Sequence, residues 1–220
     1  MTEEQHTAPR AGTQSPVLRF FANLVSYIFH PVFMPVIMGI LLYRLAANSF
    51  AGITPKEYSL KVIAIAVSTL LIPLVTVLLL KGLGFLKDIT MPNPKDRIIP
   101  LIASMTFYFW IYLVFKNTKE PLILRVFILG NFWGIMGLFL ATIFYKVSMH
   151  TTAAGGVLGL MIVLMIMSPV SMFIPLLIAI IIAGVIGTAR MLLGAHTPFE
   201  IWAGYLLGIL VQVGAYFYLA

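Results

Sequence analysis

The sequence predicts an all-α fold in which six to seven helices cross a membrane as one bundle. Hydrophobic residues make up 61% of the 220 residues and charged residues only 10%, whereas soluble domains carry about 25% charged residues. The mean hydropathy is +1.04. Apolar runs near the roughly 20 residues that cross about 30 Å of hydrocarbon recur along the chain. These observations indicate an integral membrane protein surrounded by lipid.

The chain divides into a short tail and one membrane domain. Residues 1–16 are polar and lack periodicity, so we expect a disordered N-terminal tail, and residues 17–220 form a single transmembrane domain. The first apolar run contains Pro31 and Pro35, which can kink it or split an interfacial segment from it. The candidate spans are 23–47, 59–83, 98–115, 121–145, 152–168, 170–190 and 198–219.

The connections between these spans alternate between the two faces of the membrane. One face carries loops 84–97, 146–151 and 191–197. The other face carries loops 48–58 and 116–120 and the short break near Ser168. The first three loops hold the polar residues that interrupt the apolar runs. We therefore expect the chemically active side chains to converge on one face, whether or not the first helix spans.

His196 and Glu200 stand four residues apart in "ARMLLGAHTPFE". This spacing places both on one helical face, where the carboxylate can orient the imidazole and leave its other nitrogen free as a nucleophile. A structural interpretation also fits, because Thr197, Pro198 and Glu200 match a helix-capping box. The two interpretations are compatible, since one carboxylate can serve both the cap and the histidine.

The stretch "KVSMHTTAAGG" supplies a second polar group, with Lys146, Ser148 and His150 just before a predicted helix. Either Thr151 or Thr152 can cap that helix. Backbone N–H groups at a helix start favour an anion, and Lys146 adds positive charge. The alternative for His150 is an ordinary polar residue at the membrane interface. A second histidine beside a helix start on the same face favours a functional role.

Basic side chains complete the predicted site. Three of them, Lys87, Lys95 and Arg97, lie in loop 84–97. The fourth, Arg190, is the last residue of the candidate span 170–190. Arginine binds phosphate oxygens in pairs through its planar guanidinium. The alternative is a solvated loop in which acidic neighbours neutralise the bases. Arg97 borders the next span directly, which favours a buried role for it.

Composition excludes several other chemistries. The chain has no cysteine, so disulfides and thiolate metal sites are absent. The sequence offers neither a carboxylate pair for magnesium and diphosphate nor zinc-ligand spacing, and we expect no metal and no cofactor. Gly155 and Gly156 suit helix packing better than a phosphate loop. Nucleic acid is not an expected partner, because no basic soluble domain is present. The remaining groups suit metal-free phosphoryl transfer, with one histidine attacking phosphorus and the other protonating the leaving oxygen.

These motifs resemble those of the type 2 phosphatidic acid phosphatase superfamily, which includes the vanadium haloperoxidases. Its Ser-Arg, five residues, His, three residues, Asp motif resembles Ala189-Arg190, MLLGA, His196, TPF and Glu200. Its Pro-Ser-Gly-His motif resembles residues 147–150. Its first motif, Lys, six residues, Arg-Pro, matches only at Arg97, because Ile98 follows that arginine and Thr90 holds the lysine position. The resemblance covers about residues 84–205.

The resemblance implies a six-helix phosphatase-like core and a phosphohistidine mechanism. His196 would be the nucleophile, Glu200 its orienting carboxylate, and His150 the general acid and then the base. The phosphate would be held by Arg97, Arg190, Lys87 or Lys95, Ser148 and nearby Lys146. We expect a phosphatase that acts on a lipid phosphate or isoprenoid diphosphate. The alternatives are a lipid-dependent phosphotransferase and a non-catalytic lipid-binding or transport protein.

The basic residues outside the site predict its side of the membrane. Five of the 14 basic residues are assigned to the site or adjoin it, which leaves nine. Three lie on the site face and six on the other: Arg10, Arg19 and Lys81 against Arg44, Lys56, Lys61, Lys116, Lys119 and Arg125. Because positive loops stay in the cytoplasm, we expect an extracytoplasmic active site in a bacterial inner membrane.

Overall fold

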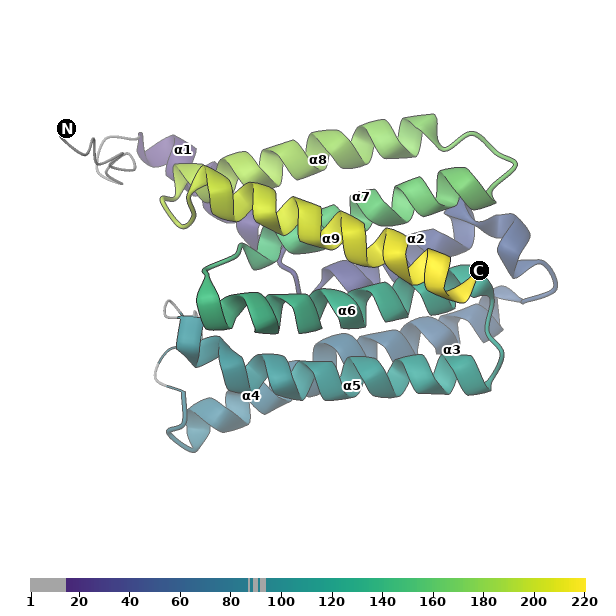
Figure 1. Cartoon of the computed structure of the whole chain (residues 1–220), viewed down its shortest axis with the longest axis horizontal. Coiled ribbons are helices and arrows are strands. Elements are labelled where there is room, and N and C mark those ends of the chain that lie inside the picture. The colour runs from purple at the N-terminus through teal and green to yellow at the C-terminus, as the bar shows by residue number, and fades with distance from the viewer. Residues whose placement is uncertain (1–14, 87, 89–90, 92–93) are drawn as a thin grey trace.

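The helices of the computed structural model lie roughly along one direction and connect alternately at its two ends (Figure 1). The structure describes residues 15–86, 88, 91 and 94–220. Within these residues six helical segments are long and apolar enough to cross a membrane. They are α3 and α4 together (Pro55–Gly82), α5 (Ile98–Asn117), α6 (Leu122–Phe144), α7 (Met149–Met167), α8 (Phe173–Leu192) and α9 (Pro198–Leu219). The prediction of an all-α membrane bundle is confirmed.

The first predicted span, 23–47, is wrong as one continuous helix. The chain forms two shorter helices there, α1 (Pro16–Ile28) and α2 (Met34–Leu45), separated by residues 29–33. Pro31 lies in this break, and Pro35 occupies the first turn of α2, where its missing N–H costs no hydrogen bond. The split that the prolines indicated is therefore what the structure shows.

The predicted N-terminal tail ends earlier than residue 16. Ser15 caps α1, its hydroxyl accepting from the Leu18 N–H at 3.3 Å, and Pro16 is the first helical residue. Both residues therefore belong to the start of a helix, and residues 1–14 lie outside the described residues. Helix α1 packs against α8 near the end of the bundle that carries the loops before α7 and α9.

The second span contains a local change of helical register. The helix α3 (Pro55–Ala66) passes through a π-helical turn, Val67–Leu71, into α4 (Ile72–Gly82). Pro73 has no N–H to donate to the carbonyl of Thr69, four residues earlier. The Tyr108 hydroxyl of α5 donates to that carbonyl instead, at 3.4 Å. A proline-induced gap in one helix is thus filled by a side chain of its neighbour.

Glycines bring α7 and α9 into backbone contact. A methyl group added at Gly155 or Gly159 of α7, or at Gly208 of α9, would lie closer than 3.0 Å to backbone atoms of the other helix. One added at Gly204 of α9 would lie equally close to the Ser148 carbonyl oxygen, just before α7. The predicted packing role of Gly155 is confirmed. At the site end, the Ser148 N–H donates to the Glu200 carbonyl at 3.3 Å. The starts of α7 and α9, and hence the predicted catalytic side chains, therefore lie side by side.

Candidate active site

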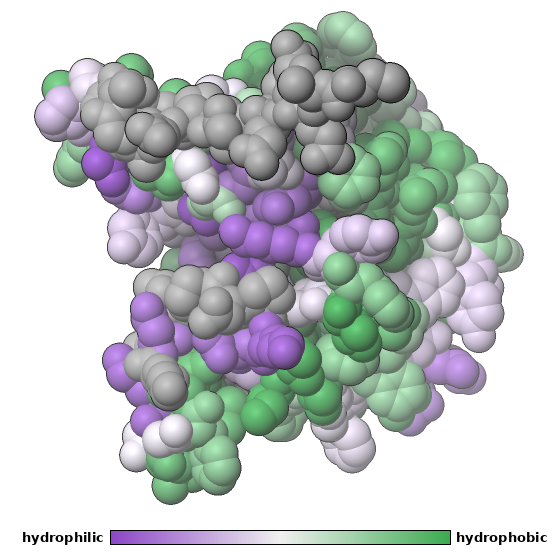
Figure 2. All heavy atoms as spheres, turned by 60° about the vertical axis from the view of Figure 1, so that its left-hand side comes forward, coloured by the Kyte–Doolittle hydropathy of each residue, from purple (hydrophilic) through white to green (hydrophobic). Residues whose placement is uncertain are grey.

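A cavity of about 340 Å³ reaches into the bundle from the end that carries the predicted site. Most of its lining is apolar and comes from α2, α4, α5, α6, α7 and α9. At one end the lining holds five basic or imidazole side chains: His30, Arg97, His150, Arg190 and His196. Figure 2 shows hydrophilic side chains gathered among hydrophobic ones on this face. The cavity thus joins a cationic site to an apolar chamber.

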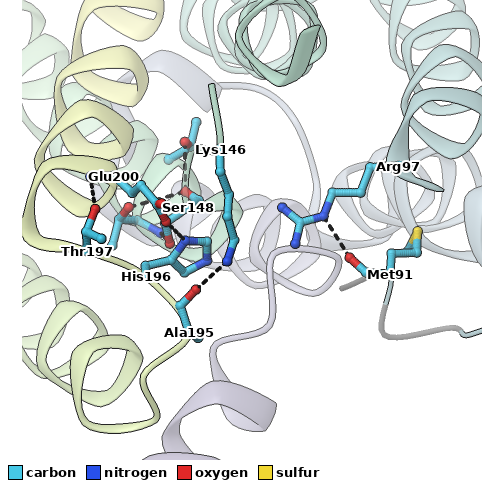
Figure 3. A network of polar contacts seen from close by, with 10 residues as sticks. Met91, Arg97, Lys146, Ser148, Ala195, His196, Thr197 and Glu200 are labelled. Carbon is cyan, nitrogen blue, oxygen red and sulfur yellow. Dashed lines mark hydrogen bonds and ion pairs between the residues drawn. The ribbon is translucent and has the colours of Figure 1, made fainter. Parts of the chain in front are cut away.

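His196 and Glu200 form the pair that their spacing predicts. His196 Nδ1 lies 2.6 Å from Glu200 Oε2, and the two side chains are 4% and 18% exposed (Figure 3). Thr197 is the N-cap of α9, and its hydroxyl accepts from the Glu200 N–H at 3.4 Å. The predicted contact and a helix cap are therefore both present, and the role of His196 as a nucleophile stays a prediction. The cap is made by the threonine, and the glutamate side chain turns to the histidine.

The environment of His196 keeps its ring neutral at pH 7. Burial lowers its pKa to about 3, and three nearby cations act in the same direction: Arg190, Lys146 and Arg97. A neutral ring that donates its Nδ1–H to the Glu200 carboxylate leaves the lone pair on Nε2. This is the protonation state that a nucleophilic histidine requires.

His150 is held from the N-terminal helix. It is 8% exposed in the first turn of α7, and its Nε2 lies 3.2 Å from the Ser26 carbonyl oxygen. A carbonyl only accepts, so Nε2 carries the proton and Nδ1 is the other nitrogen available for proton transfer. The Ser26 hydroxyl also accepts from Arg190 Nη1 at 3.3 Å. Ser26 therefore positions two predicted site residues at once, a role that the sequence did not predict.

Ser148 caps α7 and does not face the cavity. It is completely buried, and its hydroxyl accepts from the Thr151 N–H at 3.4 Å. The hydroxyls of Thr151 and Thr152 donate to the Ser148 carbonyl at 3.2 and 3.0 Å. The prediction that Thr151 or Thr152 is the cap was therefore wrong. The cap must be an extended residue just before the helix, which Ser148 is.

Lys146 connects two of the site loops. Its Nζ donates to the Ala195 carbonyl at 2.8 Å, and its charge is close enough to influence His196 (Figure 3). It is half-buried and lies beside the cavity rather than in its lining. Its main structural effect is to fix loop 193–197, and with it His196, against the segment before α7.

Arg97 and Arg190 are the two cations that line the cavity. Arg97 is 8% exposed and its Nε donates to the Met91 carbonyl at 3.0 Å. Figure 3 shows its guanidinium pointing toward Lys146 and His196. Arg190 lies near enough for the two positive charges to interact, and its buried Nε has no hydrogen-bond partner among the described residues. An anion between the two guanidiniums would reduce their mutual repulsion and accept a hydrogen bond from Arg190 Nε.

Of the two predicted first-motif lysines, the one that the structure describes is not brought to this cluster. Lys95 is exposed in the short helical turn Pro94–Arg97 and is not part of the cavity lining. Lys87 lies outside the described residues. Within the part of the chain that the structure describes, no group of three or more His, Asp or Glu side chains is placed to hold a metal ion.

His30 belongs to the site and was missed by sequence reasoning. It lies in the break between α1 and α2, lines the cavity, and its ring centroid is 5.3 Å from that of His150 at an interplanar angle of 84°. The available signal was a histidine next to a helix-breaking proline inside an apolar run. Such a residue needs a polar environment, and here the cavity provides it.

Comparisons with protein-family models, curated proteins and solved structures found no match. The assignment of this site therefore rests on the arrangement of its own residues: an imidazole with a free lone pair, a second imidazole, and two guanidiniums around one cavity.

Proposed function

We propose that this protein is an integral membrane phosphatase that cleaves a lipid phosphate or lipid diphosphate through a phosphohistidine intermediate. The observation that carries the proposal is the His196–Glu200 pair, with His196 Nε2 left free beside two arginines that line one cavity. The resemblance of residues 189–200 to a superfamily motif supports the same chemistry. This chemistry requires no metal ion, because the two guanidinium groups supply the positive charge that stabilises the phosphate.

In the first step His196 Nε2 attacks phosphorus and forms a P–N bond. The bond from phosphorus to the leaving oxygen breaks, and His150 gives that oxygen a proton. The Nε2–H of His150 stays bonded to the Ser26 carbonyl, so the ring takes up a second proton from solvent at Nδ1 when the substrate binds, and it is this Nδ1 proton that moves to the leaving oxygen. The phosphate supplies the negative charge beside which a protonated ring is favourable. Arg97 and Arg190 stabilise the charge on the equatorial oxygens.

In the second step water attacks the phosphohistidine. His150 now takes the proton of the water, the P–N bond breaks, and inorganic phosphate leaves with His196 neutral again. Glu200 holds the ring in the same tautomer throughout. The enzyme returns to its starting state with one phosphate released and one water consumed.

The apolar part of the cavity supports a substrate that carries a hydrocarbon chain. Met38 of α2, Leu101 of α5 and Leu138 of α6 are among its lining residues, beyond the arginines and histidines. A phosphate ester whose other end is a hydrocarbon chain would place its head at the cations and its chain against these side chains. A water-soluble sugar phosphate would leave this surface uncovered.

We expect phosphate release to be unaffected by chelation of divalent metals. The purified protein is incubated in detergent with a panel of lipid phosphates and diphosphates, with and without EDTA, and inorganic phosphate is measured. Equal release in both arms is the expected result. Loss of activity in EDTA with recovery in magnesium would contradict the histidine mechanism. Phosphate that appears only on an added acceptor would indicate the transferase, and no turnover of any lipid would favour a binding protein.

The distribution of basic residues supports an extracytoplasmic site. Lys119 follows α5 at the opposite end of the bundle, whereas Lys95 precedes it at the site end, and both are exposed. In this cysteine-free chain, we expect Lys95→Cys to react with a membrane-impermeant thiol reagent in intact cells and Lys119→Cys to react only after lysis. The reverse labelling pattern would place the site in the cytoplasm.

A further inference from the structure

His30 enters the site from a part of the chain that the motif resemblance does not cover. The resemblance begins near residue 84, whereas His30 lies in the break between α1 and α2. It nevertheless lines the same cavity as His150, His196 and the two arginines. Helix α1 packs on α8, whereas α2 packs on α3, α6 and α7. The connection between them, residues 30–32, contributes to the cavity lining.

The hydrogen bonds of His30 define what its ring can offer. The Val32 N–H donates to His30 Nδ1 at 3.4 Å, so in the neutral ring the proton is on Nε2. Burial, and then the charge of Arg190, lower the pKa of His30 below its ordinary value. Arg190 and His150 are the ionisable groups that its ring faces. At pH 7 the ring is thus a neutral donor with one N–H.

We propose that His30 is a third histidine of the site and binds a phosphoryl oxygen of the substrate through its Nε2–H. This inference rests on the proposed function for the identity of the anion. A neutral donor suits this position, because a further positive charge beside Arg190 would be unfavourable without substrate. His30 takes no part in proton transfer, since Nδ1 already accepts a bond from the backbone.

The competing role for His30 is mechanical support of His150. The rings of His30 and His150 pack edge to face. In this competing role, His30 would hold His150 in place and would not contact the substrate. Two variants separate the roles. His30→Phe keeps an aromatic ring for packing but removes the N–H, whereas His30→Gln removes the ring but restores a side-chain N–H donor.

The test measures kcat and KM for phosphate release from the best lipid substrate, and the affinity for inorganic phosphate by calorimetry in detergent. We expect His30→Phe to lower kcat/KM and weaken phosphate binding by roughly 10- to 100-fold, the effect of losing one hydrogen bond to a charged group. His30→Gln should recover most of both losses. Tyr27→Phe is the matched control, because Tyr27 lies just before the break and is 74% exposed. It should behave as the unmodified protein.

Three outcomes would overturn the inference. The first is unchanged phosphate affinity and turnover in His30→Phe. The second is an active His30→Phe beside an inactive His30→Gln, which would assign the residue to ring packing. The third is an equal loss in both variants. If the unmodified protein cleaves no lipid phosphate, the proposed function fails, but the phosphate-binding comparison still decides the role of His30.

Discussion

The His196→Ala variant is expected to release phosphate at least about 10⁴-fold more slowly than the unmodified protein, because removing a nucleophile removes the covalent route itself. His150 does not replace it in the proposed mechanism, because its Nε2–H is bonded to the Ser26 carbonyl and its Nδ1 serves proton transfer. Folding should be retained, since His196 lies in the loop before α9 and its only recorded side-chain partner in the described residues is Glu200. Thermal unfolding in detergent checks this point.

The covalent intermediate distinguishes loss of the nucleophile from general damage to the site. With a substrate labelled on phosphorus, acid-labile and base-stable label on the protein is the signature of phosphohistidine. His196→Ala should acquire none. The matched variant His150→Ala should still acquire label from a substrate with a good leaving group, because protonation of the leaving oxygen is then unnecessary, and should lose it slowly. Turnover by His196→Ala at the unmodified rate would refute the mechanism.

The parts of this site that the sequence predicted are those defined by local spacing. His196 and Glu200 are four residues apart, and the tight start of α9 at the Thr197 cap brings the histidine of the loop to the glutamate of the first turn. The alternation of apolar spans placed the loops before α5, α7 and α9 at one end, as Figure 1 shows. Both arguments need only short-range spacing along the chain and the thickness of a membrane.

The parts that the sequence did not predict depend on contacts between distant segments. Ser26 contacts His150 and Arg190 across 124 and 164 residues, and no local pattern encodes such a contact. The N-cap of α7 was misassigned for another reason. Serine and threonine both serve as N-caps, so Ser148, Thr151 and Thr152 leave the position of the cap undetermined until the backbone is known. Lys95 failed to reach the cavity because a helical turn directs it to solvent.

The relative position of His150 and His196 depends on a glycine contact rather than on the site itself. These residues stand at the starts of α7 and α9, which meet at Gly155 and Gly208. A methyl group at Gly155 would lie 2.8 Å from the Cα of Tyr205 and closer still to its carbonyl oxygen. Backbone atoms in a helix cannot rotate away, so the two helices must separate.

The Gly155→Ala variant is therefore expected to lose about 1–3 kcal/mol of stability, as in other overpacked cores, and roughly 100-fold in kcat/KM from displaced catalytic groups. Gly184→Ala of α8 is the matched control, because its added methyl group meets no atom within 4 Å and Gly184 is not part of the cavity lining. Its stability should stay level or rise slightly, since alanine favours a helix over glycine. Thermal unfolding and phosphate release measured on both variants decide the matter. A Gly155→Ala protein as stable and active as Gly184→Ala would show that close packing of α7 and α9 does not set the distance between the two histidines.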